Sequence, residues 1–190
     1  MAVHVAFGPG GATTCEWLVR QACSRRDARG DGTHVVYVQH AACDRGSSPA
    51  TVSARLGLAR DDDEHCEAAQ LFDAVGRLIT EREHAPGSVV VAMSEAHLFG
   101  APMPGLVAQM ARLGFAVYVT SACCDDRRMA LATAAPLLVH ADDARKLGER
   151  CDRCGGDAHY PYTHKDGGRR GVLCRACHEA CVDPKSGVAW

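Results

Sequence analysis

Two Cys-x-x-Cys pairs near the end of the chain constrain its fold more than any other feature. The first pair is Cys151 and Cys154, the second is Cys174 and Cys177, and nineteen residues lie between them. Each pair can present two thiolates to one ion, and two pairs complete the tetrahedral shell that zinc takes. Such a shell has no open position for water, so we predict a structural zinc site rather than a catalytic one. Two disulfides or four free thiols are the alternatives.

Length and charge exclude several classes of protein. The 190 residues allow one α/β domain with a small appendage. A net charge of -2 provides no basic surface, so we expect neither nucleic acid nor anionic lipid as a partner. No apolar run approaches the ~20 residues of a membrane span. Met1–Phe7 leads directly into a strand pattern, so we expect no signal peptide.

The remaining cysteines point to a reducing compartment. The chain has eleven cysteines, and those outside the two pairs are scattered and odd in number, which argues against a disulfide framework. We therefore expect a cytoplasmic protein.

Apolar segments typical of strands alternate with amphipathic segments typical of helices. Such alternation predicts a parallel sheet flanked by helices, with right-handed crossovers. A polar surface loop is expected over Cys43–Asp63, with the acidic run Asp61–Glu64 as a solvated helix cap. The expected strands are 3–7, 34–38, 88–93, 115–119 and 134–139, and the expected helices are 13–28, 64–83, 103–113 and 142–147.

Three loops are expected to meet at one edge of this sheet, because ligands of parallel sheets bind beyond the carboxyl ends of the strands. They are Gly8–Thr14, Ser94–Phe99 and Cys123–Arg128. The first joins a strand to a helix through a glycine-rich turn, as phosphate-binding loops do, although it could also be a simple tight turn. The residues that would contact a phosphate or its metal are Gly8, Pro9, Gly10, Gly11, Thr13 and Thr14.

Several motifs, in this order, resemble those of the type II thymidine kinases, with poxvirus members nearest in size. Phe7–Pro9, followed by a helix containing Leu18–Arg20, resembles the family's Gly-Pro-x-x-x-Gly-Lys-[Ser/Thr]-Thr loop. Ser94–Phe99 resembles its Asp-Glu-x-Gln-Phe motif. Lys146–Cys154 and Leu173–Cys177 match the patterns that open and close its zinc lobe.

The resemblance implies a P-loop-type α/β domain over residues 1–148, a small zinc-ribbon lobe over 149–181 and a tail over 182–190. A lasso loop, Gly155–Val172, would close over the nucleoside, and Glu95 would be the general base on the sugar 5′-hydroxyl. Glu95 could alternatively be an exposed helix cap. The family also implies homo-oligomers. The expected substrate-binding residues are Arg128, Tyr160, Tyr162, Gly167 and Gly168.

The chain differs from the family at the positions that bind phosphate, metal and base. The phosphate-loop lysine is replaced by Thr14, or by Ala12 if two residues are deleted, and the metal-binding aspartate is replaced by Ser94. The aromatic residue that stacks on thymine is replaced by Asp126. Loss of one preorganised donor alone costs about 3–4 kcal/mol of transition-state stabilisation.

Three functions remain open. The favoured one is a thymidine kinase homologue that is impaired or inactive and serves as an interaction protein. If that homologue is viral, its expected partner is a host or viral protein in the host cytoplasm. An active, divergent kinase that binds ATP, Mg²⁺ and thymidine for DNA synthesis is the alternative. A zinc-ribbon nucleic-acid binder is disfavoured by the net acidity and the few aromatic residues.

A few other side chains are expected to have structural and not functional roles. Cys123 and Cys124 could be a redox pair, but adjacent cysteines form a strained bridge, so loop thiols are favoured. His97 is expected to be a histidine with its hydrogen bonds satisfied at a strand end. The histidines near the zinc cysteines are expected at the surface: His159, His164 and His178.

Overall fold

The chain folds around a parallel sheet of six strands in the order β3-β2-β4-β5-β1-β6. This computed structural model describes residues 2–30, 32–43, 48–68, 86–165, 170–183, 185 and 188–189. Each neighbouring pair of strands in the sheet is parallel. The strands are β1 (Val3–Phe7), β2 (His34–His40), β3 (Glu64–Ala68), β4 (Val89–Ser94), β5 (Ala116–Ser121) and β6 (Asp143–Lys146).

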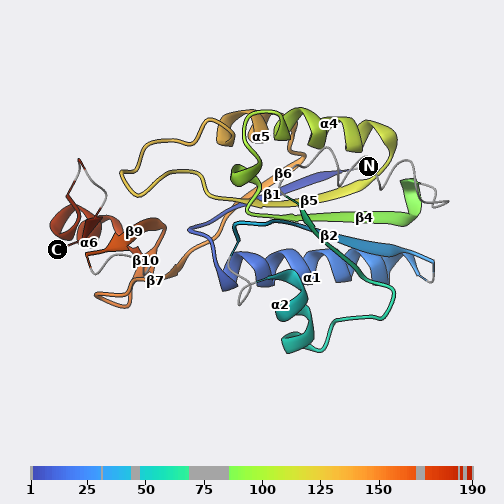
Figure 1. Ribbon diagram of the computed structural model, residues 1–190, viewed down its shortest axis with the longest axis horizontal. Helices are drawn as coiled ribbons and strands as arrows, with labels where there is room; N and C mark the ends of the chain where they lie inside the picture. The colour runs from blue at the N-terminus through green and yellow to red at the C-terminus, as the bar shows by residue number, and fades with distance from the viewer. Residues whose placement is uncertain are drawn as a thin grey trace.

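Helices cover both faces of the sheet (Figure 1). One face carries α1 (Ala12–Arg29) and α2 (Pro49–Leu56), and the other carries α4 (Met103–Leu113) and α5 (Ala134–His140). Short 3-10 helices, η2 (Pro86–Ser88) and η3 (Ala96–Phe99), flank β4.

The strand sequences explain why two apolar layers are needed. Within β4, Val90 and Ala92 pack with α1, whereas Val89, Val91 and Met93 pack with α4 and α5. A strand with both faces covered reads as a continuous apolar run instead of an alternating one. This confirms the prediction of an α/β sheet flanked by helices.

Local signals set the end of α4 and the start of α2. Helix α4 ends before Gly114, which adopts a left-handed conformation (φ 106°) and donates its N–H to the carbonyls of Met110 and Ala111. The predicted bounds of α4 are confirmed. Helix α2, absent from the prediction, begins after Ser48, whose hydroxyl accepts a hydrogen bond from the N–H of Thr51.

Three sequence predictions were wrong, and strand pairing explains the first and the third. The helix expected from Glu64 begins instead as β3, which pairs with β2, and the rest of that predicted helix lies outside the described residues. Residues 134–139 belong to α5 and not to a strand. The segment expected as a helix after Asp142 is β6, which fills the free edge of β1 while the Asp142 carboxylate accepts the N–H of Val3.

The acidic run also differs from its prediction as a solvated cap. The side chain of Asp63 is 1% exposed and forms an ion pair with Arg26, at 2.8 Å between Oδ1 and Nη1. Its other oxygen accepts the N–H of Arg60. Asp63 therefore joins the start of β3 to the last turns of α1.

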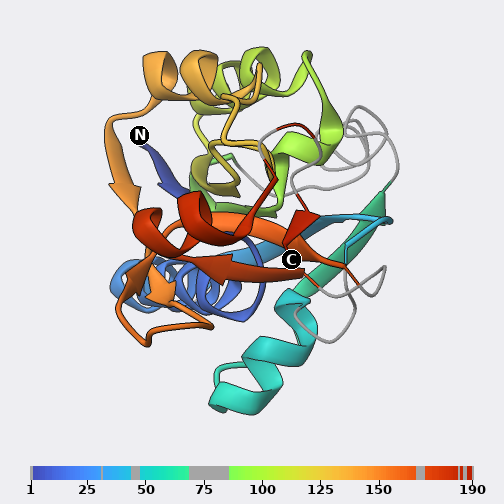
Figure 2. The ribbon, with the colours of Figure 1, turned by 90° about the vertical axis from the view of Figure 1, so that its left-hand side faces the viewer.

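A small lobe follows the sheet and stands in front of its edge in Figure 2. Its strands are β7 (Glu149–Arg150), β8 (Asp157–Ala158), β9 (Tyr160–His164), β10 (Arg170–Leu173) and β11 (Val188–Ala189), and its helix is α6 (Arg175–Cys181). The β10-β9-β11 sheet contains much of the segment expected as a lasso loop. The segment expected as a tail also contributes, because β11 pairs with β9.

Across the described part of the chain, none of the helices has the length and apolarity needed to cross a membrane.

Candidate functional site

The four cysteines of the two pairs converge in the lobe. Four sulfur atoms all lie within 4.8 Å of one another, those of Cys151, Cys154, Cys174 and Cys177. The sulfurs of Cys154 and Cys174 are 3.7 Å apart, close to the about 3.8 Å that a tetrahedral shell with 2.3 Å metal–sulfur bonds requires. All four are free of disulfides. These residues could therefore hold a metal ion.

Two local structures position these sulfurs. After Cys151 the chain turns through Gly155, which has a left-handed backbone (φ 74°) and donates its N–H to the Cys151 carbonyl at 2.9 Å. Cys174 is the N-cap of α6, and its sulfur accepts the N–H of Cys177 at 3.4 Å. Each pair therefore uses a tight turn or a helix start to direct two sulfurs the same way.

The histidines of the lobe are not part of this cluster, as the sequence predicts, but one of them is not at the surface. His178 is 4% exposed, and its Nε2 lies 3.1 Å from the carbonyl oxygen of Asp126. His159 and His164 are half-buried. His178 was missed because its partner comes from a loop more than fifty residues away.

The carboxyl edge of the sheet brings the three expected loops together, because β4, β5 and β1 are neighbours. The turn after β1 is anchored by the N–H of Gly8, which donates to the Ser121 carbonyl at 3.1 Å. Gly10 and Gly11 follow with φ of 88° and 90°, a conformation that favours glycine. Gly11 is the N-cap of α1, so this turn precedes a helix N-terminus as predicted.

Glu95 directs its carboxylate at this glycine turn. A side chain placed on Gly10 would have its Cβ 3.3 Å from both carboxylate oxygens of Glu95. Burial raises the pKa of Glu95, while a hydrogen bond from the Gly11 backbone and the charge of Arg170 act in the opposite direction. Glu95 also has a left-handed backbone (φ 52°), which is costly for a residue with a side chain.

His97 lies beside Glu95 and is neutral at physiological pH. Its Nδ1 accepts the N–H of Ala122 at 3.2 Å, and its Nε2 is 3.8 Å from the Glu95 carboxylate. Burial, followed by the charges of Arg170 and His40, lowers the pKa of His97 to about 4. The prediction of a histidine with a satisfied hydrogen bond is confirmed for Nδ1.

Most of the residues expected at the phosphate and metal positions are buried. Thr14 is 1% exposed, and its hydroxyl donates to the Gly11 carbonyl at 2.9 Å. Thr13 is exposed. Ser94 is 4% exposed at the end of β4. Neither the turn nor the first turn of α1 contains a lysine or arginine.

The expected substrate-binding residues fall into separate places. Arg128 and Tyr160 lie together where the loop after β5 meets the lobe: the guanidinium carbon is 4.9 Å from the ring centroid. Tyr162 is 4% exposed in the lobe core, with its hydroxyl 2.8 Å from Nε2 of His164. Gly167 and Gly168 lie outside the described residues.

The loop after β5 contacts the lobe, and its yellow trace extends toward the lobe in Figure 1. Arg128, which has φ of 66°, forms an ion pair with Glu179 at 2.8 Å. Asp126 accepts a hydrogen bond from the Thr163 hydroxyl and offers its carbonyl to His178. Asp126 therefore contacts the lobe. Sequence reasoning missed this junction because all of its partners are distant in the chain.

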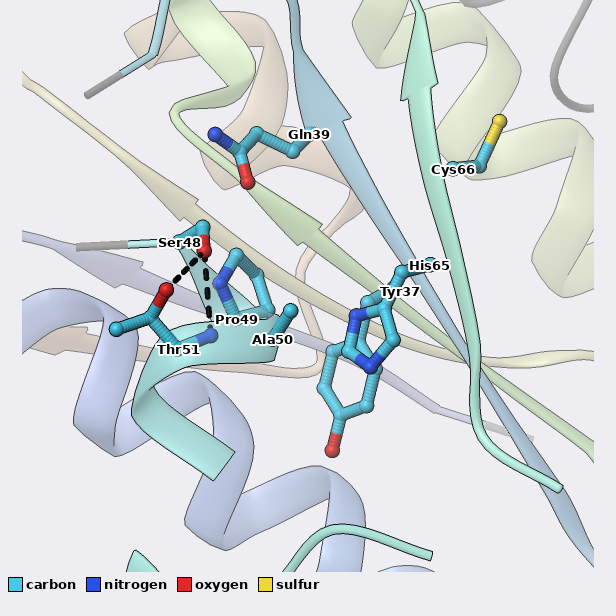
Figure 3. Close-up of a pocket in the computed structure, with 8 residues that line it drawn as sticks. All are labelled: Tyr37, Gln39, Ser48, Pro49, Ala50, Thr51, His65 and Cys66. Carbon is cyan, nitrogen blue, oxygen red and sulfur yellow. Dashed lines mark hydrogen bonds between the residues drawn. The ribbon is translucent and has the colours of Figure 1, made fainter. Parts of the chain in front are cut away.

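A cavity of about 390 Å³ lies between α2 and strands β2 and β3 (Figure 3). It has uncharged polar groups on its wall, among them Gln39, Ser48 and Thr51, and the ring of His65 stacked on Tyr37. Gln39 pairs in register with Ser94, so the cavity is one strand away from Glu95. The cavity could not be predicted from the sequence, because β3 was expected to be a helix.

Neither comparison with known proteins found a match: no family model fits the chain, and no curated protein matches it.

Proposed function

We propose that this chain is a homologue of the type II thymidine kinases that has lost most or all of its catalysis and serves as an interaction protein. The order of the central strands supports the proposal. Strand β5 lies between β1 and β4, and the glycine turn after β1 still faces the glutamate after β4. This arrangement supports the proposal of a nucleotide-binding scaffold, whose function would depend on what occupies that edge.

The observation that carries the proposal is the contact between Glu95 and the turn at Gly10 and Gly11. Backbone N–H groups of such a turn are the groups that would hold a phosphate. Here a carboxylate of the chain takes that position, and the turn supplies no lysine to offset a second negative charge. Two like charges about 4 Å apart repel by about 4 kcal/mol at an effective dielectric constant of about 20. A bound phosphate would therefore be strongly disfavoured.

The lobe is proposed to hold one structural zinc ion. Cys151, Cys154, Cys174 and Cys177 supply four sulfurs and no open coordination position, which is the donor set of structural zinc rather than of magnesium or calcium. When bound, the zinc would cross-link the β7-β8 turn to the start of α6. It would contribute to folding and not to a reaction.

An active kinase is the second candidate, and Arg170 favours it. The charge of Arg170 lowers the pKa of both Glu95 and His97, so its guanidinium lies within electrostatic reach of the turn. An arginine from the lobe could then replace the missing lysine. Glu95 would in that case be the general base.

A phosphotransfer assay with Mg-ATP and thymidine, combined with calorimetry, separates the two candidates. We expect no turnover above background and no nucleotide binding by the natural chain. We expect Glu95→Gln to gain measurable Mg-ATP binding, because the repelling charge is removed while its size is kept. Glu16→Gln, in the first turns of α1, is the matched control.

The opposite result would support the active kinase. Thymidine phosphorylation by the natural chain that is lost in both Glu95→Gln and Arg170→Gln would overturn the proposal of lost catalysis.

A further inference from the structure

The cavity between α2 and the sheet is built by the pleat of two neighbouring strands. Tyr37 of β2 packs in the core under α1 and α2, whereas Val36 and Val38 on either side of it pack in the opposite core. Side chains of a strand alternate between its two faces, so Gln39 lies on the same face as Tyr37. His65 of β3 pairs with Tyr37 in register and stacks on its ring. Tyr37, Gln39 and His65 therefore share one wall of the cavity.

The start of α2 forms the wall that faces these strands. The Ser48 hydroxyl accepts the N–H of Thr51 at 3.2 Å and donates to the Thr51 hydroxyl at 2.9 Å, as the dashed lines in Figure 3 show. Pro49 is buried in the first turn of the helix. These contacts are internal to α2, so the geometry of this wall does not depend on a ligand.

The strand wall presents two polar groups to the cavity. Within the described part of the chain, neither the carboxamide of Gln39 nor the ring nitrogens of His65 form a hydrogen bond. Gln39 is half-buried, and Figure 3 shows its carboxamide extended toward the start of α2. A carboxamide offers N–H donors and a carbonyl acceptor side by side. The cavity therefore holds a donor and an acceptor in a fixed place.

The cavity wall carries no fixed charge. Among the described residues that line it there is no aspartate, glutamate, lysine or arginine. Burial lowers the pKa of His65, against the opposing effect of the Asp63 charge, so its ring is neutral at physiological pH. A charged ligand would lose its hydration here without gaining a counter-charge. The ligand that fits is therefore uncharged.

We propose that this cavity binds an uncharged aromatic carboxamide, whose ring stacks on His65 while its amide pairs with the carboxamide of Gln39. The rings of Tyr37 and His65 are already nearly parallel, with an interplanar angle of 8° and centroids 4.9 Å apart. Because His65 is exposed, the face of its ring away from Tyr37 is open to a third ring. Two carboxamides can exchange one N–H···O bond in each direction, which fixes the orientation of the ligand.

The spacing of these groups and the size of the cavity agree with such a ligand. Gln39 lies two residues beyond Tyr37, which is about 6.6 Å along the strand, and a ring with an amide substituent can bridge that distance. The volume of about 390 Å³ falls within the range of small-molecule sites, about 300–1,000 Å³. The site uses neither the glycine turn nor Glu95, so it does not depend on the proposed function.

The test is a titration of the full chain with a set of ring compounds, followed by ligand-detected NMR. Benzamide and nicotinamide carry both the aromatic ring and the amide, and we expect both to bind. Benzoate has nearly the same shape with a negative charge, and we expect it to bind at least about 10-fold more weakly. Cyclohexanecarboxamide keeps the amide on a ring that cannot stack, and we expect it to bind about 2- to 10-fold more weakly.

Two variants with matched controls test the residues. Gln39→Leu should weaken benzamide binding about 10-fold, because leucine keeps much of the volume and removes both hydrogen bonds. Gln109→Leu is its control, since Gln109 is exposed on α4 at the opposite face of the sheet. His65→Ala should weaken benzamide binding about 2- to 10-fold through loss of the stack. His4→Ala is its control, because His4 stacks on Tyr118 at the same angle of 8° but does not line the cavity.

The ligand series uses the natural chain, so the test holds even where a variant is unstable. Thermal denaturation of each variant separates loss of binding from loss of the fold. No saturable binding of benzamide up to about 10 mM, the weak limit for a ligand of this size, would overturn the proposal. Equal binding of benzamide and benzoate, equal binding of benzamide and cyclohexanecarboxamide, or unchanged benzamide binding in Gln39→Leu would overturn it as well.

Discussion

The central sheet and the C-terminal lobe reach stability in different ways. Among the described residues, eighteen buried apolar residues fill the layer under α4 and α5, and twelve fill the layer under α1 and α2. The lobe has six, and one of those is the cysteine Cys151. A unit of about 40 residues cannot usually bury enough apolar surface to fold alone. We therefore expect the lobe to depend on a metal ion held by its four sulfurs, whereas the sheet depends on packing.

This difference also shows where sequence change is tolerated. The sheet can lose the charged groups of a catalytic edge and keep its fold, because its two apolar layers do not involve them. The lobe has no comparable apolar layer, so we expect that substitution of any of its four clustered cysteines would disrupt its fold. The four cysteine sulfurs lie close together, and the glycine turn has no lysine. Under the proposed function, the lobe has kept its cysteines while the sheet has lost catalytic groups.

Removal of the metal should have the largest effect and should be confined to the lobe. A structural zinc site of this type has an apparent binding free energy of about 10–16 kcal/mol. We expect a strong chelator to remove hydrogen-exchange protection from residues 149–181 while β4 and β5 stay protected. Hydrogen exchange with mass spectrometry checks this, and elemental analysis should find about one zinc per chain before chelation.

A matched pair of variants sharpens the same test. Cys154→Ser should lose the zinc, whereas Cys181→Ser should keep it because Cys181 is not among the four clustered sulfurs. Equal loss of protection in the lobe and in the sheet after chelation would contradict the division between the two regions.

The second prediction concerns the one strongly buried ion pair described in the sheet domain. Arg26 and Asp63 have side chains that are 3% and 1% exposed. Asp63→Asn leaves the guanidinium buried without its counter-charge, and removal of one partner of such a pair costs about 3–5 kcal/mol of unfolding free energy. Urea denaturation measures the loss.

Asp62→Asn is the control for that measurement. The side chain of Asp62 is 50% exposed and lies 3.6 Å from His34, so its loss should cost at most about 1 kcal/mol. If the two variants were equally stable, the sheet would depend on packing alone and the contrast with the lobe would be sharper than proposed.

The smallest effect is expected at the junction of the two regions. Arg128 pairs with Glu179 at 2.8 Å, but its side chain is 32% exposed. Arg128→Gln should therefore cost only about 0.2–1 kcal/mol, and limited proteolysis of the loop after β5 should be faster. Arg127→Gln, one residue away and exposed, should change neither. A loss comparable to that of Asp63→Asn would mean that the regions are a single unit.

The parts of the fold that the sequence predicts are those set by local signals. Helix α4 carries its own stop at Gly114, and strand β4 is a continuous apolar run, so both could be recognised in isolation. The spacing of the cysteine pairs is also a local pattern, which predicts a metal site without knowledge of the fold. Their convergence in space needed only two short turns.

The parts that could not be predicted are those set by distant partners. Asp143–Lys146 resembles a short helix after a capping aspartate, but it pairs with β1 because that strand has a free edge. Asp63 belongs to an acidic run, and only the buried guanidinium of Arg26 shows why it is enclosed. At the candidate site, the glycine turn and Glu95 were predicted, whereas the charge of Arg170 reaches them from a separate lobe.

The position of β1 has a consequence for how the chain is made. This strand pairs only with β5 and β6, and its partner Val117 lies more than 110 residues after Val3. At about 5–20 residues per second, a ribosome needs about 6–23 s to produce that partner. Throughout this interval a largely apolar strand lacks its neighbours, so nascent chains should engage holding chaperones until the middle of the sheet has been synthesised.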